Sequence, residues 1–184
     1  MRFRFFYPCM VVFCVQSCSE KQAEREESKE SIDYVEIEGK LRLVRKKGAL
    51  CYTERCAGCH GSDGVGGGAF PPLDGSDFVT GDPQRLALII HKGVFGPITV
   101  KGKTYNLDRM PGWEGEIGND ELSKIMTYVR GSWSNSSQVT KEDQLITPKM
   151  TEQWIKEAKH IEGPLSADTY ASGLWKKLIL KKKN

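Results

Sequence analysis

The sequence predicts an all-α domain with a small β-hairpin insertion and extra segments at both ends of the chain. Apolar residues recur at helical spacing over 82–93 and over 119–131, where Asp82-Pro83 and Asn119 supply helix starts. Between these helices, the run 97–105 contains a Lys-Gly pair between short strand-like segments, which predicts the hairpin. The 184 residues are enough for one domain with appendages.

Residues 1–17 are predicted to be a secretory signal. Arg2 and Arg4 precede a largely apolar stretch that ends at Val15 and is too short to span a bilayer. The stretch leads into Val15-Gln16-Ser17-Cys18, which looks like a bacterial lipobox, in which the cysteine is lipidated and becomes the mature N-terminus. Simple cleavage that leaves Cys18 free or paired is the alternative.

Residues 18–44 are expected to form a tether and lead-in segment. Ser19 to Glu30 is dense in Glu, Lys and Arg and has no large apolar side chain, so it cannot bury a core. The pattern from Ile32 to Val44 fits either a short strand or a loop packed on the domain surface. Removal of residues 1–17 takes away two arginines and lowers the formal net charge from +3 to +1. No nucleic-acid partner is therefore expected.

One motif carries most of the chemistry, the run Cys56-Ala57-Gly58-Cys59-His60. Two cysteines three apart on a helical turn project from the same side, so both sulfurs can bond the two vinyl groups of one haem. The next residue, His60, is then placed to ligate the iron. A zinc site or a thioredoxin-like pair would need a second Cys/His pair or a βαβ pattern, and the sequence offers neither.

Met110 is predicted to be the second iron ligand. It lies 50 residues after His60, is followed by Pro111-Gly112-Trp113, and is expected on a loop before the closing helix. A thioether is a soft ligand that favours ferrous iron, so a His/Met pair raises the reduction potential relative to His/His. Met126 suits a helix core better, and Met150 lies outside the domain.

Three further residues are assigned to the cofactor site. Pro71 is favoured over Pro72 as the residue whose carbonyl accepts a hydrogen bond from the other ring nitrogen of His60. Tyr105 either reaches a haem propionate or packs in the core. Trp113 follows Met110 closely and is assigned to the site with it.

Residues 45–135 resemble a class I mono-haem cytochrome c domain. The similarity consists of a helix into CxxCH, a Pro-Pro-Leu turn, a Met-Pro loop and a closing helix with Met-Thr-Tyr-Val-Arg. It implies the cytochrome c fold and one covalent haem c. It also implies thioether bonds to Cys56 and Cys59, with His60 and Met110 as proximal and distal ligands.

The helix that leads into the motif is expected from Gly48 to Cys56, with Cys51 as a small buried apolar residue. The resemblance implies that this helix packs against the closing helix. The residues expected to meet there are Gly48, Tyr52, Ile125 and Tyr128.

Residues 136–184 exceed what such a domain needs and are assigned to a C-terminal extension. A helix is expected over Thr151 to His160, with His160 solvated. The mixed basic and apolar end from Gly173 to Lys183 either docks on an acidic partner or an anionic membrane, or is frayed or packed on the haem domain.

Together these features predict an exported electron carrier rather than an enzyme, lipid-anchored on the periplasmic side of a bacterial membrane. With both axial positions filled, no vacancy remains for a substrate, and a single CxxCH argues against a peroxidase. The expected partner is a membrane redox complex or a periplasmic dehydrogenase. A haem-based redox or gas sensor and a fixed electron-relay subunit are the alternatives.

Overall fold

The computed structural model describes residues 35–106 and 108–181. The signal, Cys18 and the segment from Ser19 to Glu30 lie outside these residues. Residues 40–184 form one compact unit, and residues 35–39, which belong to the other unit, are helical. Within the described residues, no helix is both long and apolar enough to cross a membrane.

The helix before the CxxCH motif covers residues 35–55, so it begins well before the expected Gly48. Residues 35–44, for which a strand or loop was expected, are therefore helical. Six of these ten residues are Glu, Lys, Arg or Leu, which have high helix propensity. Leu41, Gly48 and Tyr52 are its buried positions, and their spacing of seven and four places them on one helix face.

The other helices follow the sequence pattern, with shifted ends. Helix α4 begins after Asp82, whose side chain accepts a hydrogen bond from the Gln84 backbone nitrogen at 3.0 Å. The cap of α5 is Gly118 rather than the expected Asn119, which lies in the first turn. The helices are α2 (Ala57–His60), α3 (Asp77–Thr80), α4 (Pro83–Lys92), α5 (Asn119–Arg130), the 3-10 helix η1 (Trp133–Ser137), α6 (Lys141–Gln144), α7 (Pro148–Glu157), α8 (Ala167–Ala171) and α9 (Leu174–Leu180).

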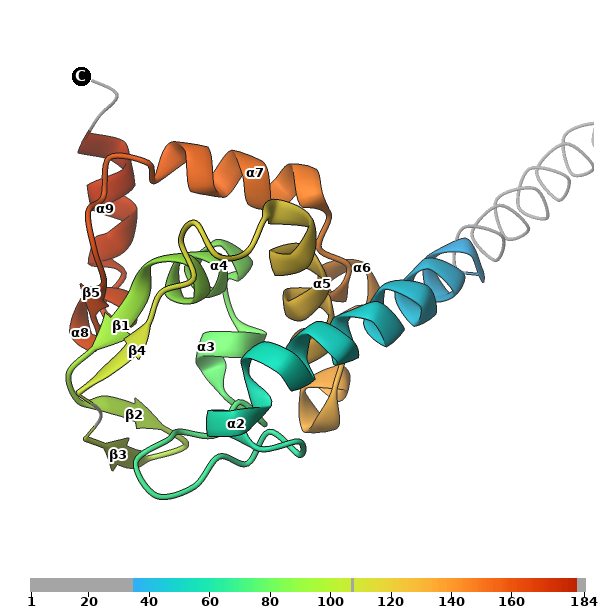
Figure 1. Cartoon of the computed structure of the whole chain (residues 1–184), viewed down its shortest axis with the longest axis horizontal. Helices are drawn as coiled ribbons and strands as arrows, with labels where there is room; N and C mark the ends of the chain where they lie inside the picture. Colours follow the sequence, from blue (N-terminus) through green and yellow to red (C-terminus); the bar gives the residue numbers. More distant parts are fainter. Residues whose placement is uncertain (1–34, 107, 182–184) are drawn as a thin grey trace, which may run out of the picture. The chain divides into compact units, whose positions relative to one another are not determined.

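Two small sheets complete the fold (Figure 1). The predicted hairpin is confirmed and consists of β2 (Ile98–Val100) and β3 (Lys103–Tyr105). The other sheet has the order β4-β1-β5 and was not predicted. Its central strand β1 (Gly93–Phe95) pairs antiparallel with β4 (Arg109–Pro111) and parallel with β5 (Leu165–Ser166).

The N-terminal helix crosses α5 at Gly48, as expected. A Cβ atom at Gly48 would lie 2.2 Å from the Lys124 carbonyl oxygen and 2.8 Å from Tyr128 Cβ, so only glycine permits this approach. One turn later, the rings of Tyr52 and Tyr128 lie 5.2 Å apart between centroids. This crossing fixes the position of the helix that directly precedes the CxxCH motif.

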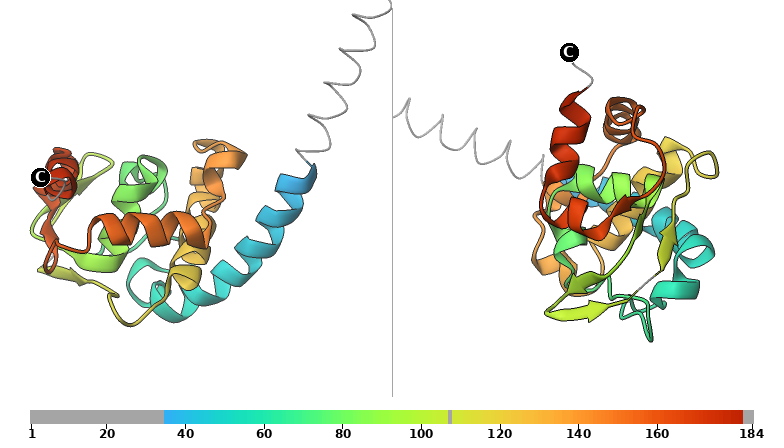
Figure 2. Two further views of the ribbon diagram at one scale, coloured as in Figure 1. Left: turned by 90° about the horizontal axis from the view of Figure 1, so that it is seen from above. Right: turned by 90° about the vertical axis from the view of Figure 1, so that its left-hand side faces the viewer.

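The buried side chains form two clusters. The first core cluster lies between the N-terminal helix, α4 and α5, and the second joins α4 and both sheets to the C-terminal extension. Figure 2 shows α7 (orange) lying beside the rest of the domain, and α9 (red) following directly after α8. The first cluster contains Tyr52, Val79, Leu86, Ala87, Ile90, Ile117, Leu122, Ile125, Met126, Val129 and Ile146; the second contains Phe78, Leu88, Ile89, Val94, Ile98, Val100, Ala158, Ile161, Ala167, Tyr170 and Trp175.

For the end of the chain from Gly173, the structure supports the alternative in which the segment packs on the haem domain, and it does so over α9. Tyr170 and Trp175 are 0% and 1% exposed. His160, expected to be solvated, bonds through Nε2 to the Leu178 carbonyl oxygen at 2.8 Å. The extension and the haem domain therefore share a core.

Candidate haem site

An apolar cavity of about 950 Å³, its open mouth included, lies between the CxxCH motif and strand β4. The lining includes residues from α2, the loop after it, α4, both sheets and α5. These are Cys56, Cys59, His60, Phe70, Pro71, Pro72, Leu73, Ser76, Phe78, Val79, Leu86, Ile89, Ile90, Val94, Gly96, Ile98, Val100, Arg109, Met110, Pro111, Ile125 and Val129.

His60 is 7% exposed and has one ring nitrogen engaged by the backbone. Its Nδ1 lies 3.0 Å from the carbonyl oxygen of Pro71, to which it donates. Nε2 is then the nitrogen that remains for a metal. Burial lowers the pKa of His60 below its usual value, so the imidazole is neutral, the form that ligates iron.

The glycine-rich loop 61–68 brings Pro71 to His60. Gly66 donates from its backbone nitrogen to the His60 carbonyl oxygen at 2.9 Å, and a Cβ there would lie 2.5 Å from the Phe70 carbonyl oxygen. The Gly64 carbonyl accepts from the backbone nitrogens of Leu73 and Asp74 at 2.8 and 3.0 Å. The loop thus reverses the chain beside the cavity.

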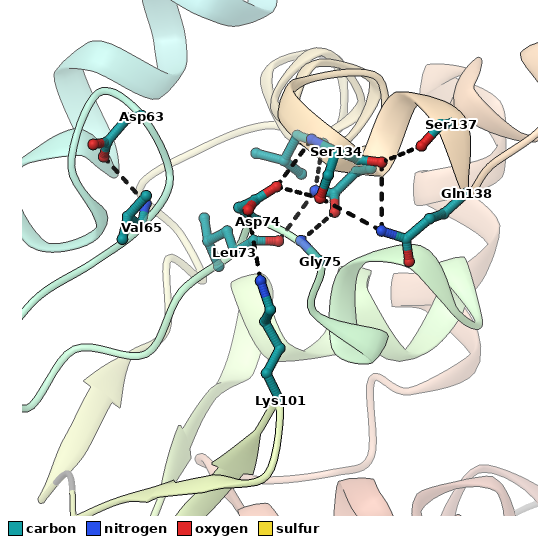
Figure 3. A network of polar contacts seen from close by, with 11 residues as sticks. Asp63, Val65, Leu73, Asp74, Gly75, Lys101, Ser134, Ser137 and Gln138 are labelled. Atoms are coloured by element: carbon teal, nitrogen blue, oxygen red, sulfur yellow. Dashed lines mark hydrogen bonds and ion pairs between the residues drawn. The ribbon is translucent and has the colours of Figure 1, made fainter.

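A polar network then fastens the end of this loop (Figure 3). The Asp74 carboxylate accepts hydrogen bonds from the backbone nitrogen (2.9 Å) and the hydroxyl of Ser134, and Lys101 Nζ lies 3.7 Å away. The Ser134 bonds are the main reason that the pKa of Asp74 is lowered. Asn135, fully buried, accepts from the Gly75 backbone nitrogen at 2.7 Å and donates to the Leu73 carbonyl at 3.1 Å. The part of the cavity lining that follows Pro72 in the sequence is therefore held in place by η1.

The three described cysteines are free thiols in different surroundings. Cys56 and Cys59 both line the cavity, whereas Cys51 packs against the first core cluster, as expected of a small apolar residue. Burial raises the pKa of Cys56 to about 12. The motif therefore presents two sulfurs and one imidazole to the same cavity.

Met110 lies in strand β4, not on the expected loop, and lines the cavity with His60. It pairs with Val94 of β1. Two glycines allow the strands to approach: a Cβ at Gly93 would lie 2.6 Å from the Met110 carbonyl oxygen, and one at Gly112 would lie 2.4 Å from the Lys92 carbonyl carbon. Such long-range pairing is not visible in the local pattern around Met110.

The segment after Met110 is fastened to the end of α4. The backbone nitrogen of Trp113 donates to the Ile90 carbonyl, and that of Glu114 to the His91 carbonyl, both at 3.0 Å. Lys92, 5% exposed, donates from Nζ to Glu114 Oε1 at 2.6 Å. That hydrogen bond is the main reason that the pKa of Glu114 is lowered.

Two residues assigned to the cofactor site lie outside the cavity lining. Trp113 packs against the first core cluster, with the Arg55 guanidinium 5.5 Å from its ring centroid. Tyr105 packs against the second cluster, with Lys103 Nζ 4.8 Å from its ring centroid. Conversely, Arg109 lines the cavity and was missed. Its position next to Met110 in the sequence could have indicated that it belongs to the site, and its positive charge suits the carboxylates of a haem.

The comparisons with known proteins agree with this geometry. The family model described as Cytochrome c matches residues 45–133. Cytochrome c-552 of Thermus thermophilus is 32% identical over 106 residues, which cover 55% of this chain and 70% of that relative. The chain belongs to the cytochrome c family. Its described helices, with a small strand insertion, form the predicted fold.

Other relatives of this cytochrome are longer proteins. The cytochrome c subunit of the quinone alcohol dehydrogenase of Gluconobacter oxydans is 34% identical over 92 residues, or 49% of this chain and 19% of the relative. FixP, a subunit of the cbb3-type cytochrome c oxidase of Bradyrhizobium diazoefficiens, is 34% identical over 91 residues, or 49% and 31%. The chain thus spans about a fifth to a third of these relatives.

As a class I mono-haem cytochrome c, the protein binds haem c covalently and transfers electrons. The residues present fit that group. The cavity is apolar, two thiols lie in the attachment spacing, and a neutral imidazole and a thioether line the same space. This donor set is the one associated with electron-carrying haems of raised potential.

Proposed function

We propose that this cytochrome carries single electrons between respiratory or dehydrogenase partners through a haem held by Cys56 and Cys59 and ligated by His60 and Met110. The observation that carries the proposal is that His60 and Met110, 50 residues apart in the sequence, line one apolar cavity. The haem supplies an iron that cycles between the ferric and ferrous states. With both axial positions held by the protein, no position is left for a substrate.

The residues around the cavity favour transfer over catalysis. The hydrogen bond to Pro71 fixes the tautomer and orientation of His60, so the imidazole keeps its place in both oxidation states. Met110 is held by the β4-β1 pairing. Two ligands held by a rigid frame need little rearrangement when an electron arrives or leaves.

The proposal places the protein on the periplasmic side of a bacterial membrane, anchored through a lipidated Cys18. Its support is the sequence: the basic and apolar residues 1–17, the Ser17-Cys18 junction and the CxxCH motif. The charged residues 19–30 would then separate the anchor from the haem domain.

The test is the optical spectrum of the full chain matured with haem, oxidised and reduced, with and without CO. We expect a low-spin spectrum with a weak ferric sulfur-to-iron band that CO does not alter. Met110→Ala should abolish that band and let CO bind the ferrous form. Met150→Ala is the matched control, because Met150 packs against the first core cluster away from the cavity lining. A high-spin or CO-binding wild type would contradict the carrier and favour a sensor.

A fixed relay subunit is the second candidate, and the names of several relatives support it. Several relatives are named as cytochrome subunits, including that of gluconate 2-dehydrogenase from Pantoea cypripedii, 30% identical over 99 residues. Purification from native membranes separates the two. A mobile carrier leaves at high salt, whereas a relay subunit remains with its dehydrogenase or oxidase.

A further inference from the structure

The C-terminal extension supports the strand that pairs with the Met110 strand. Val94, in the central strand β1, is paired with Met110 on one side and with Leu165 on the other. Val94 and Met110 both line the cavity, and Leu165 packs against the second core cluster. The strand that supports the thioether is therefore itself supported by a segment more than 50 residues further along the chain.

Tyr170 adds a specific polar contact to this support. It is 0% exposed, and its hydroxyl donates a hydrogen bond to the Gly93 carbonyl oxygen at 3.2 Å, across 77 residues of sequence. Gly93 is the residue of β1 that packs directly against the Met110 carbonyl. Burial raises the pKa of Tyr170, so the hydroxyl remains protonated and able to donate.

The extension is in turn anchored to α4 and to itself. Lys176 Nζ lies 2.7 Å from Asp82 Oδ2, at the start of α4. Glu157 Oε2 accepts from Gln84 Nε2 at 2.9 Å. Trp175, 1% exposed, belongs to the second core cluster together with Val94. These contacts hold the segment that carries Tyr170, so Tyr170 does not simply move with β1 if that strand shifts.

We propose that Tyr170 is a positioning residue for the distal ligand: by holding β1, it keeps β4 and the Met110 thioether in place beside the cavity. The C-terminal extension is in this sense part of the haem site. The inference rests on the proposed His60/Met110 ligation. A shift of the Met110 backbone requires β4 to separate from β1 or to move with it, and the Tyr170 hydrogen bond opposes the second movement.

The test is Tyr170→Phe in the full-length, haem-loaded protein, which removes one oxygen atom. Imidazole is the probe, because it displaces a labile thioether from ferric iron. We expect its apparent affinity to rise about fivefold, the factor associated with a lost buried hydrogen bond. The sulfur-to-iron band should weaken in parallel. Global stability is measured by denaturant unfolding of the same samples.

Tyr52→Phe is the matched control. Tyr52 also donates from a buried phenol to a glycine carbonyl, that of Gly61, at 2.6 Å, but on the His60 side. We expect Tyr52→Phe to lower the free energy of unfolding without raising imidazole affinity. Equal imidazole affinity in the wild type and Tyr170→Phe would overturn the inference, as would an equal rise in both variants.

If Tyr170→Phe does not incorporate haem, a second variant tests the same inference. His160→Ala removes the bond to the Leu178 carbonyl, which ties α9 to the segment after α7, and leaves the Tyr170 hydroxyl in place. A rise of about twofold in imidazole affinity supports the inference, and no rise contradicts it. If the wild type lacked the sulfur-to-iron band and bound CO, the proposed His60/Met110 ligation itself would be overturned.

Discussion

The two sides of the haem cavity are built in different ways. On the His60 side, the hydrogen bonds nearest the imidazole are local: Pro71 is 11 residues from His60, and Tyr52 reaches Gly61 across 9 residues. On the Met110 side, strand β4 is placed by β1 and β5, and Tyr170 contacts Gly93 across 77 residues. One ligand belongs to a compact motif and the other to a tertiary assembly.

Because of this difference, we expect the two iron ligands to differ in how easily they are released. Local hydrogen bonds survive partial opening of distant segments, whereas a sheet made of three separate segments is weakened when any one of them leaves. We therefore expect perturbations of this protein to release Met110 before His60. Variants at single positions on each side test that expectation.

The largest effect is expected at Gly93, on the Met110 side. Gly93 has φ +86°, and a Cβ there would lie 2.6 Å from the Met110 carbonyl oxygen. Gly93→Ala therefore combines backbone strain with a collision against backbone that cannot rotate away. We expect a loss of about 3 kcal/mol in the free energy of unfolding, with loss of the sulfur-to-iron band. Denaturant unfolding and ferric absorption measure the two.

Gly102→Ala separates strain from collision. Gly102 has φ +76°, but a Cβ there would meet nothing within 4 Å. This variant should lose only about 1 kcal/mol and keep the band. If Gly93→Ala behaved like Gly102→Ala, close β1-β4 contact would not be what holds Met110.

A smaller and less selective effect is expected at Gly48, on the His60 side. Alanine inside a helix is normally favourable by about 1 kcal/mol, but here its Cβ would lie 2.2 Å from the Lys124 carbonyl oxygen. Gly48→Ala should therefore lower the free energy of unfolding by about 2 kcal/mol through overpacking, with the ferric band retained in the folded fraction.

Gly39→Ala is the comparison, because a Cβ at Gly39, also helical, would meet nothing within 4 Å. This variant should be neutral or stabilising by up to about 1 kcal/mol. Loss of the sulfur band in folded Gly48→Ala protein would show that the two sides are not independent.

The local parts of the fold could be predicted from the sequence. The CxxCH spacing, the Asp82 cap and the apolar positions of α4 and α5 are short-range patterns, and short-range physics places them. The expected strand or loop before Val44 was wrong because the alternation did not mark a buried face: of these apolar residues Leu41 is buried, whereas Val35 and Leu43 are 71% and 57% exposed on the helix.

The Met110 side could not be predicted in the same way. Met110 was identified by its chemistry and its distance from His60, but its strand depends on partners at 93–95 and 165–166 that carry no local signal. Strands of two or three residues are too short for periodicity to show. The packing of Tyr170 and Trp175 likewise appears only when the chain is folded, because the basic residues that follow Trp175 resemble a solvated tail.

The smallest expected effect concerns Glu114, which fastens the segment after Met110. The hydrogen bond from Lys92 holds the pKa of Glu114 below its ordinary value of 4.5. A lowered folded-state pKa means that the contribution to stability is present above pH 4.5 and is lost as the pH falls through the folded value. The carboxylate is half-exposed, so screening limits the contribution to about 0.5–1 kcal/mol.

Glu114→Gln should therefore lower the free energy of unfolding at pH 7, and its difference from the wild type should shrink as the pH falls below 4.5. Glu116→Gln, two residues along and exposed, removes the same charge as a control and should differ little from the wild type at any pH. A Glu114→Gln deficit that persisted in acid would assign the effect to packing rather than to the ion pair. Because this contact is made on the Met110 side, the deficit at pH 7 should be accompanied by slightly tighter imidazole binding, which Glu116→Gln should not show.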